Sequence, residues 1–422
     1  MLIGFSFENF ASFKQETSFS MLASKKDEFI DLNTFEILDE RLLKSSLIYG
    51  PNGSGKTNWI KALSFMKDVV IKSVIDKTVL TKYETFKFVE NAEGNKTAFH
   101  ISFIKNEVLY NYGFSILDNS IVEEWLEKKV KRTTVLFSRK KSNWKSISLH
   151  GTFKKAEKIK HFTRDNSLFL TTSAMFNVEI ANEIVEWFND LIIIIGDFKT
   201  PGYTIKYMVE KKDNKDRILK ELKIADSGIL DFELEVFEKG KESTDKIKTN
   251  QFNRIDEEEL ENKTKELLVD LKTRHNVYDI NKEVVKEIEL SFQKYQSLGT
   301  IKFFELLGPI LDSLENGKVL IIDEIDSRLH CRIVQYILSL YNSIDKNSKN
   351  SQLICNTHNV LLLGEDLRRD QIWFVQKNSQ GESELYSLDD FKNVRKEDPK
   401  LRKYLLGAYG AIPDTTRGWD NV

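Results

Sequence analysis

The opening fifty residues alternate apolar and polar positions with a period near two. Phe5 and Phe7, and later Phe10 and Phe13, are separated by polar neighbours, and this spacing is typical of β-strands that bury one face. The stretch ends in a short apolar run, Ser45 to Tyr49. We therefore expect opening β-strands followed by a buried strand at 45–49.

A glycine-rich segment and a helical pattern follow that strand. Residues 50–57 read GPNGSGKT, and residues 58–70 then carry apolar side chains at helical spacing. Glycines mark turns, and apolar side chains three or four positions apart mark one face of a helix. The order strand, loop, helix is therefore predicted for 45–70.

Strand-like runs recur from Thr85 to Leu126. FHISFI, VLYNYGFSIL and IVEEWL are separated by turn-forming residues, which favours a meander of antiparallel strands. Residues 150–195 are predicted to be helical and then extended, with Trp187 in the core. The last third alternates helices with apolar runs, which is typical of a mainly parallel sheet covered on both faces. The helices expected there are 301–315 and 328–341, and the strands are 318–322, 352–356, 371–376 and 385–388.

Between the two ordered parts lies a polar segment rich in Lys and Glu. We read KKDNKDR and EKGKESTDKIKTN as loops or exposed helices, and DEEELENKTKELLVDLKTRH, residues 256–275, as an amphipathic helix. At about 100 to 200 residues per domain, 422 residues provide two or three domains or lobes. The expected division is an N-terminal half at 1–195, a polar and largely helical insertion at 196–285, and a C-terminal half at 286–422.

Charge and cysteine content limit the partners and the compartment. The 63 Lys and Arg residues nearly cancel the 65 Asp and Glu residues, so any nucleic-acid contact must come from a local patch. Residues 128–160 are strongly basic and include Lys128, Arg139 and Lys141; a solvated surface and a nucleic-acid contact are both open readings. Two cysteines, no aliphatic run long enough to cross a bilayer and no basic leader favour a cytoplasmic protein without a membrane anchor.

The glycine-rich segment matches a phosphate-binding motif. Gly50, Gly55, Lys56 and Thr57 satisfy G-x-x-x-x-G-K-[ST] in the strand-to-helix context that the motif requires. Backbone amides and the helix N-terminus attract phosphate oxygens, Lys56 bridges the β- and γ-phosphates, and the Thr57 hydroxyl faces Mg²⁺. The cofactors predicted are ATP and Mg²⁺. The candidate binding residues of this segment are Gly50, Asn52, Gly53, Ser54, Gly55, Lys56, Thr57 and Asn58.

A second candidate lies at Lys318 to Asp326, where four apolar residues lead to two adjacent carboxylates. This is the Walker B arrangement, with Asp323 holding Mg²⁺ through water and Glu324 orienting or deprotonating the attacking water. Upstream, Ser297 and Gly299 at a predicted helix start provide a second anion site. Downstream, His358 follows a strand and could contact the γ-phosphate. We reject a zinc site formed by His330, Cys331, Cys355 and His358. Adjacent helical residues point about 100° apart, so His330 and Cys331 cannot easily face one ion, and small buried thiols such as Cys355 are common in apolar strands.

The order of these elements resembles the ABC-type ATPases of the SMC, RecF and OLD group. YGPNGSGKTN, SLGT followed by LLGPILDSLENGKVLIIDEIDSRLH, QIWFVQK and YLLGAYGAIP are similar to stand-alone anti-phage ATPases of the AbiL/RloA type. The resemblance implies an α/β P-loop NTPase head with a mixed sheet, an antiparallel β subdomain and a helical insertion. It also implies two heads that pack head to tail, with Ser297 and Gly299 of one copy closing on the nucleotide of the other.

The chain departs from that group's pattern in its signature, where Leu298 replaces the first glycine and Thr300 replaces the glutamine. We therefore expect slow, switch-like hydrolysis, with Lys56, Glu324 and His358 as catalytic residues, in a homodimer or higher homo-oligomer. The function expected is an ATP-dependent sensor or scaffold in phage defence, acting through a separate TOPRIM-type nuclease. The alternative hypothesis is a RecF-like DNA repair ATPase that binds DNA in an ATP-dependent way. A transporter subunit and an AAA+ ATPase are the remaining hypotheses.

Overall fold

The computed structural model describes residues 1–90, 94–140, 144–196, 202–211, 213–238, 267–364 and 366–413. The chain divides into two compact units. The first comprises Met1–Gly196, Ser313–Ile325 and Ile337–Val422, and the second comprises Asp197–Asp312 and Asp326–Tyr336. The three-part division expected from the sequence remains a prediction. In the part of the chain that the structure describes, no helix is both long enough and apolar enough to cross a membrane.

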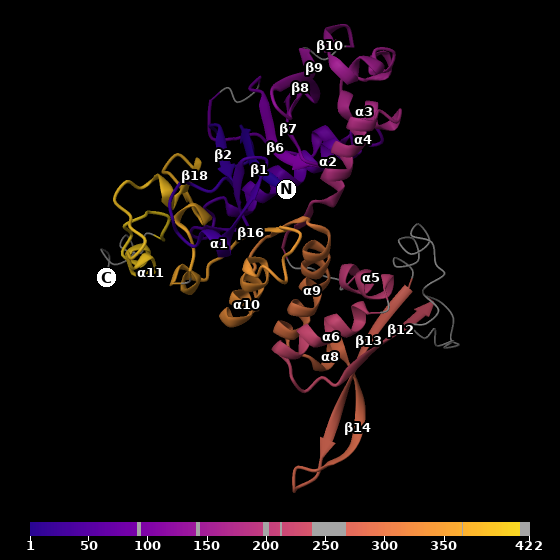
Figure 1. The fold of residues 1–422 in the computed structure, drawn as a ribbon, viewed down its shortest axis with the longest axis vertical. Coiled ribbons are helices and arrows are strands. Elements are labelled where there is room, and N and C mark those ends of the chain that lie inside the picture. The colour runs from indigo at the N-terminus through magenta and orange to yellow at the C-terminus, as the bar shows by residue number, and fades with distance from the viewer. Residues whose placement is uncertain are drawn as a thin grey trace. The chain divides into compact units, whose positions relative to one another are not determined.

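The first unit contains a seven-stranded antiparallel sheet with the spatial order β10-β9-β8-β7-β6-β1-β2 (Figure 1). Its strands are β1 Leu2–Glu8, β2 Thr17–Ser20, β6 Thr97–Lys105, β7 Val108–Leu117, β8 Ser120–Lys129, β9 Thr133–Lys140 and β10 Ile147–Leu149. The predicted meander is confirmed by β6, β7 and β8, which pair in succession. Side chains of β6 alternate between buried and half-buried along most of the strand because one face of the sheet packs on the core, whereas residues 112–116 of β7 are buried without interruption.

A second, mixed sheet of the same unit has the order β11-β15-β16-β5-β17-β18, in which only the last pair is antiparallel. Its strands are β11 Ile192–Ile194, β15 Val319–Ile322, β16 Gln352–Asn356, β5 Ser45–Tyr49, β17 Ile372–Lys377 and β18 Ser383–Ser387. The strands predicted at 45–49, 318–322, 352–356, 371–376 and 385–388 are confirmed within one or two residues. Since parallel strands end at one edge, the segments after β5, β15 and β16 meet there.

Helix α2 (Lys56–Lys72) contributes its apolar side to a core that both sheets share. Trp59 is fully buried, and its ring lies 5.9 Å from that of Phe5 and 4.7 Å from that of Phe19. The Phe19 ring in turn lies 4.9 Å from that of Trp373 on β17. The contact between Phe19 and Trp373 joins the two sheets directly, and Trp59 packs α2 against β1 and β2 beside it. Two further helices contact α2: α3 Phe169–Met175 and α4 Glu179–Asp190.

The basic stretch at 128–160 is not uniformly a surface patch. Arg139 is 1% exposed and pairs across the β8–β9 register with Glu124, which is also buried. Its guanidinium donates to the carbonyl of Ser167, and Glu124 accepts from the backbone N–H groups at the start of α3. The inclusion of Arg139 in a cationic patch was therefore wrong, because a cross-strand carboxylate neutralises it. Lys141 lies outside the described residues.

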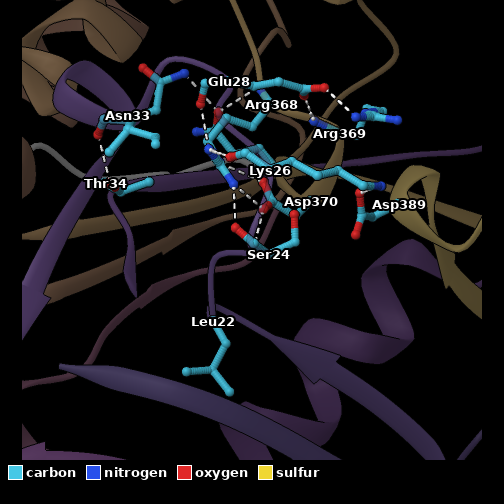
Figure 2. Close-up of polar contacts among 12 residues, drawn as sticks. Leu22, Ser24, Lys26, Glu28, Asn33, Thr34, Arg368, Arg369, Asp370 and Asp389 are labelled. Carbon is cyan, nitrogen blue, oxygen red and sulfur yellow. Dashed lines mark hydrogen bonds and ion pairs between the residues drawn. The ribbon is translucent and has the colours of Figure 1, made fainter. Parts of the chain in front are cut away.

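A second buried arginine fixes residues 24–28, which follow β2, to the chain before β17 (Figure 2). Arg368 is 1% exposed, forms a bidentate pair with Asp370 and donates to the carbonyls of Ser24, Lys26 and Glu28. Such a fully hydrogen-bonded pair holds two distant segments in one geometry. Short elements complete this unit: α1 Ile30–Asn33, β3 Thr34–Ile37, β4 Glu40–Leu43 and α11 Lys400–Leu405.

The second unit combines helices with a three-stranded antiparallel sheet, β12-β13-β14. Its elements are α5 Gly202–Glu210, α6 Asn214–Ala225, β12 Asp231–Glu238, β13 Leu267–Tyr278, β14 Val284–Ser291, α8 Phe292–Tyr295 and the beginnings of α9 (Leu298–Asn316) and α10 (Cys331–Asn342). The helix predicted at 256–275 is wrong from Leu267 onward, because that segment pairs with strands on both sides. Residues 239–266 lie outside the described part of the chain.

Helix α9 contains Pro309, which cannot donate to the carbonyl of Glu305 one turn earlier. The hydroxyl of Thr204 on α5 donates to that carbonyl at 2.8 Å. Gly308 permits this approach, since a Cβ there would lie 2.5 Å from the Thr204 Cα. The close packing of α5 against α9 therefore compensates the proline.

Candidate functional site

The loop between β5 and α2 has a backbone that only glycine can follow at two points. Gly50 and Gly55 have φ angles of 156° and 116°. A Cβ on Gly50 would lie 2.3 Å from the Val375 carbonyl oxygen of β17, and one on Gly55 would lie 2.5 Å from the Ser383 Oγ of β18. Both the conformation and the space exclude a side chain. The loop therefore curls tightly beside β17 and β18.

Lys56, the first residue of α2, is 6% exposed. Its ammonium donates to the carbonyls of Gly50 and Pro51 at 2.8 and 3.1 Å. The lysine thus spans the loop and places a positive charge within it. Ser54 is also buried, and its Oγ has no hydrogen-bond partner among the described residues. This hydroxyl is free to donate to a ligand oxygen, as the fit of a phosphate into the loop requires.

Two serines that sequence reasoning missed hold the loop in place. The Ser383 hydroxyl donates to the carbonyl of Ser54 at 2.5 Å, and its oxygen lies within hydrogen-bond distance of the Ser12 Oγ, at 2.8 Å. The amide of Asn58 donates to the same Ser12 hydroxyl at 2.9 Å. Asn58, expected at the nucleotide, therefore braces the loop in this structure. Isolated serines far apart in the chain give no sequence signal for such a contact.

The end of β15 brings the acidic pair to the phosphate loop. The Thr57 hydroxyl donates to the Asp323 carboxylate, at 3.0 and 3.2 Å from its two oxygens. Asp323 is 4% exposed, and its backbone N–H donates to the Ile194 carbonyl of β11 at 2.8 Å. A hydroxyl and a carboxylate in contact supply the hard oxygen ligands that Mg²⁺ prefers. These two residues fit a magnesium ion.

Asn356, at the end of β16, links both carboxylate residues. Its side-chain amide donates to Asp323 Oδ1, and its Oδ1 accepts from the backbone N–H of Glu324. Glu324 is exposed and has a φ angle of 50°, a left-handed conformation that is uncommon outside glycine. We did not single out Asn356 from the sequence. The sequence signal that could have marked Asn356 as a site residue was its position at the end of a predicted strand, where side chains of a parallel sheet meet a ligand.

His358 lies two residues after Asn356 and lines one cavity with Gly50, Asn52, Gly53 and Ser54. The cavity has a volume of about 810 Å³. Its remaining lining comprises Tyr49, Pro51, Val360, Lys377, Tyr404, Leu405, Ile412 and Pro413. Burial raises the pKa of Tyr404 to about 12, so the phenol stays protonated and donates to the Ala411 carbonyl at 2.8 Å. The C-terminal segment therefore forms an ordered, largely apolar wall of this cavity.

Ser297 and Gly299 belong to the second unit, at the start of α9. The Ser297 Oγ accepts from the Thr300 backbone N–H at 3.0 Å, as an N-cap does. A Cβ on Gly299 would lie 2.8 Å from the Arg328 carbonyl oxygen. Ser297 is exposed, and the neighbouring Leu298 is 62% exposed. This segment presents its polar groups and one apolar side chain at a surface.

Among the predicted site residues, the structure brings Gly50 to Thr57, Asp323, Glu324 and His358 together in the first unit. A strand, a glycine loop with a buried lysine, a helix and an aspartate at the end of a nearby parallel strand define the class of P-loop NTPases. The predicted fold class, an α/β P-loop NTPase head with a mixed sheet and an antiparallel β subdomain, is confirmed. The chain belongs to the family described as "AAA domain, putative AbiEii toxin, Type IV TA system", which matches residues 45–364.

Two solved structures are similar over most of the chain. The SmcHead bound to the C-winged helix domain of ScpA is 13% identical, with a TM-score of 0.41, and the match covers 92% of this chain and 97% of that one. The SMC head domain from Thermotoga maritima is 11% identical, with a TM-score of 0.39, and the match covers 92% and 98%. No curated protein matches the chain.

Proposed function

We propose that this protein binds and hydrolyses ATP as a slow switch within an anti-phage defence system. The single observation that carries the proposal is the contact between Thr57 and the Asp323 carboxylate beneath a phosphate loop, with Glu324 next in the chain. The family's description, which names an AbiEii toxin, supports the assignment to defence. The specific AbiL/RloA type remains part of this proposal.

The residues of the first unit have distinct roles in the proposed reaction. The loop amides, Ser54 and Lys56 would bind the phosphates, and Thr57 and Asp323 would hold Mg²⁺, which when bound neutralises phosphate charge. Glu324 would accept a proton from the attacking water. Asn356 fixes the Glu324 backbone against Asp323, so it positions the base relative to the metal ligand.

We further propose that two copies pack head to tail, with Ser297 and Gly299 of one copy reaching the nucleotide of the other. The exposure of Ser297 and Leu298 supports a role at an interface between copies. A separate effector, which we propose to be a TOPRIM-type nuclease, would respond to the ATP-bound dimer. Hydrolysis would end that state.

The experiment compares the wild-type protein with Glu324→Gln, using Glu397→Gln, an exposed carboxylate of the same unit, as the control. Removal of a general base lowers a rate by roughly 100-fold to 10,000-fold, so we expect Glu324→Gln to bind ATP but to hydrolyse it at least 100-fold more slowly. Light scattering with Mg-ATP should show a dimer of this variant. Equal turnover in the wild type and Glu324→Gln would overturn the assignment.

The defence role has its own test. Cells carrying the gene with its neighbouring genes would be challenged with phage, alongside cells carrying the Glu324→Gln allele. We expect protection in the wild type and altered protection in the variant, and co-purification of a nuclease with the ATP-bound protein. If cells that carry the wild-type gene gave the same plaque counts as cells without it, for every phage of a panel, the defence role would be contradicted. The ATPase proposal would not be affected.

A further inference from the structure

The cavity beside the phosphate loop is lined by a lysine other than Lys56. Lys377, the last residue of β17, lines the same space of about 810 Å³ as Gly50 to Ser54 and His358. Sequence reasoning assigned no role to it. Because Lys56 already lies within the loop, Lys377 adds a separate positive charge on the cavity side.

The backbone of Lys377 is fixed relative to the loop. Strand β17 pairs with β5 in parallel, and Gly50 lies so close to the Val375 carbonyl that no side chain fits between them. Across the β17–β18 hairpin, Lys377 pairs with Ser383, whose hydroxyl donates to the Ser54 carbonyl. Lys377 therefore lies directly opposite a residue that is hydrogen-bonded to the phosphate loop.

The ammonium of Lys377 has no hydrogen bond or ion pair with any described residue, and the side chain is exposed. Several basic residues elsewhere in this unit are paired with carboxylates. Figure 2 shows three of them: Arg368 pairs with Asp370, Arg369 with Glu28 and Lys26 with Asp389. Lys403 likewise pairs with Asp398. A lysine without a carboxylate partner beside a phosphate loop is a cation that an anionic ligand can use.

We propose that Lys377 binds the terminal phosphate of a nucleoside triphosphate and thereby distinguishes it from a diphosphate. The inference rests on the proposed function and names a specificity-determining residue within it. A lysine suits this task because its ammonium is a compact charge on a flexible stem that can reach a phosphate oxygen from a rigid strand. His358, which lines the same cavity, would be a further side chain near that phosphate.

The experiment measures the dissociation constants of ATP and ADP by calorimetry, with Glu324→Gln as the background so that ATP persists. The variants are Lys377→Ala, Lys377→Arg and, as a control, Lys392→Ala, an exposed lysine of the same unit. Loss of one charge-assisted hydrogen bond weakens binding by about tenfold or more. We expect Lys377→Ala to weaken ATP binding by about that factor and to change ADP binding less than about twofold, with Lys377→Arg largely restoring ATP binding.

Three outcomes decide the proposal. The proposal would be overturned if Lys377→Ala and Lys392→Ala bound ATP with equal affinity. It would also be overturned if Lys377→Ala lost equal affinity for ATP and for ADP, since the lysine would then not distinguish the terminal phosphate. Thermal unfolding of Lys377→Ala at the wild-type temperature, together with a selective loss of ATP affinity, would support it. Failure of the Glu324→Gln background to bind either nucleotide would instead contradict the proposed function.

Discussion

The phosphate-loop region of the first unit and the signature region of the second differ in how they are built. In the former, Lys56, Asp323 and Asn356 are almost fully buried, and each hydrogen-bonds within its own unit. In the latter, Ser297 and Leu298 are exposed, and the Ser297 hydroxyl contacts only the next turn of its own helix among the described residues.

This difference separates two ways of assembling a site. Buried, hydrogen-bonded groups are positioned before a ligand arrives, so the free energy of binding is not spent on ordering them. Exposed groups contribute only when another surface meets them. We therefore expect changes in the phosphate-loop region to alter ATP binding by a single copy, and changes in the signature region to alter hydrolysis only where two copies meet.

The largest expected effect comes from Lys56→Ala. The substitution removes the buried ammonium that lies across the loop, so the charge-assisted bonds to two phosphates are lost. At about 1.5 to 3 kcal/mol for each bond to a charged group, ATP binding should weaken by roughly 100-fold or more. Calorimetry with Mg-ATP measures this in a single copy at low protein concentration.

Lys61→Ala is the matched control for that variant, since Lys61 lies on the same helix but is exposed. It should bind ATP as the wild type does. ATP binding by Lys56→Ala with wild-type affinity would mean that the loop, despite its shape, does not hold phosphates in the proposed way.

An intermediate effect is expected for Asn356→Ala, which removes the link between Asp323 and the Glu324 backbone. Loss of a group that orients a metal ligand lowers metal affinity by about 10-fold to 100-fold. The Mg²⁺ concentration for half-maximal hydrolysis should therefore rise at least tenfold, while ATP binding without Mg²⁺ stays unchanged. A titration of hydrolysis against Mg²⁺ measures the shift.

Asn347→Ala provides the control for the loss of a buried asparagine. Asn347 is 2% exposed, and its amide donates to the carbonyls of Tyr341 and Ser351. Its variant should unfold at a lower temperature without changing the Mg²⁺ midpoint. If Asn356→Ala and Asn347→Ala raised the Mg²⁺ concentration for half-maximal hydrolysis equally, the effect of Asn356→Ala would come from a general loss of stability.

The sequence predicts those parts of the site whose residues are close together along the chain. Gly50 to Thr57 are contiguous, and Asp323 follows its own apolar strand, so periodicity and spacing were sufficient. Ser12 and Ser383 could not be assigned a role because their contacts join segments far apart in the chain and use a residue type that occurs on any surface. Asn356 ends a predicted strand, which could have marked it as a candidate, but its contact with Asp323 depends on which strands are neighbours. The strand order of the mixed sheet brings Asn356 to Asp323 and Ser383 to the loop, and Ser12 reaches Ser383 from the turn between β1 and β2 of the other sheet.

The incorrect predictions have the same physical origin. Residues 267–275 combine leucines with charged side chains, and a helix was expected there, but strands on both sides satisfy their backbone groups as β13. Tertiary pairing overrides local propensity in this way. Arg139 was grouped with surface cations because Glu124, its partner, lies on the preceding strand and is visible only once the register is known.

The smallest expected effect, and the sharpest test of the comparison, comes from Ser297. Ser297→Ala removes the N-cap of α9, which costs about 1 kcal/mol, and removes the proposed contact to the nucleotide of a second copy, which we expect to slow hydrolysis about fivefold. Ser297→Asp keeps a capping oxygen but adds a negative charge, so it should restore stability and slow hydrolysis further by repelling phosphate. Thermal unfolding, ATP binding at low concentration and turnover at high concentration separate the two roles. If Ser297→Asp restores both stability and turnover, the serine is only a cap and the signature region does not meet the nucleotide.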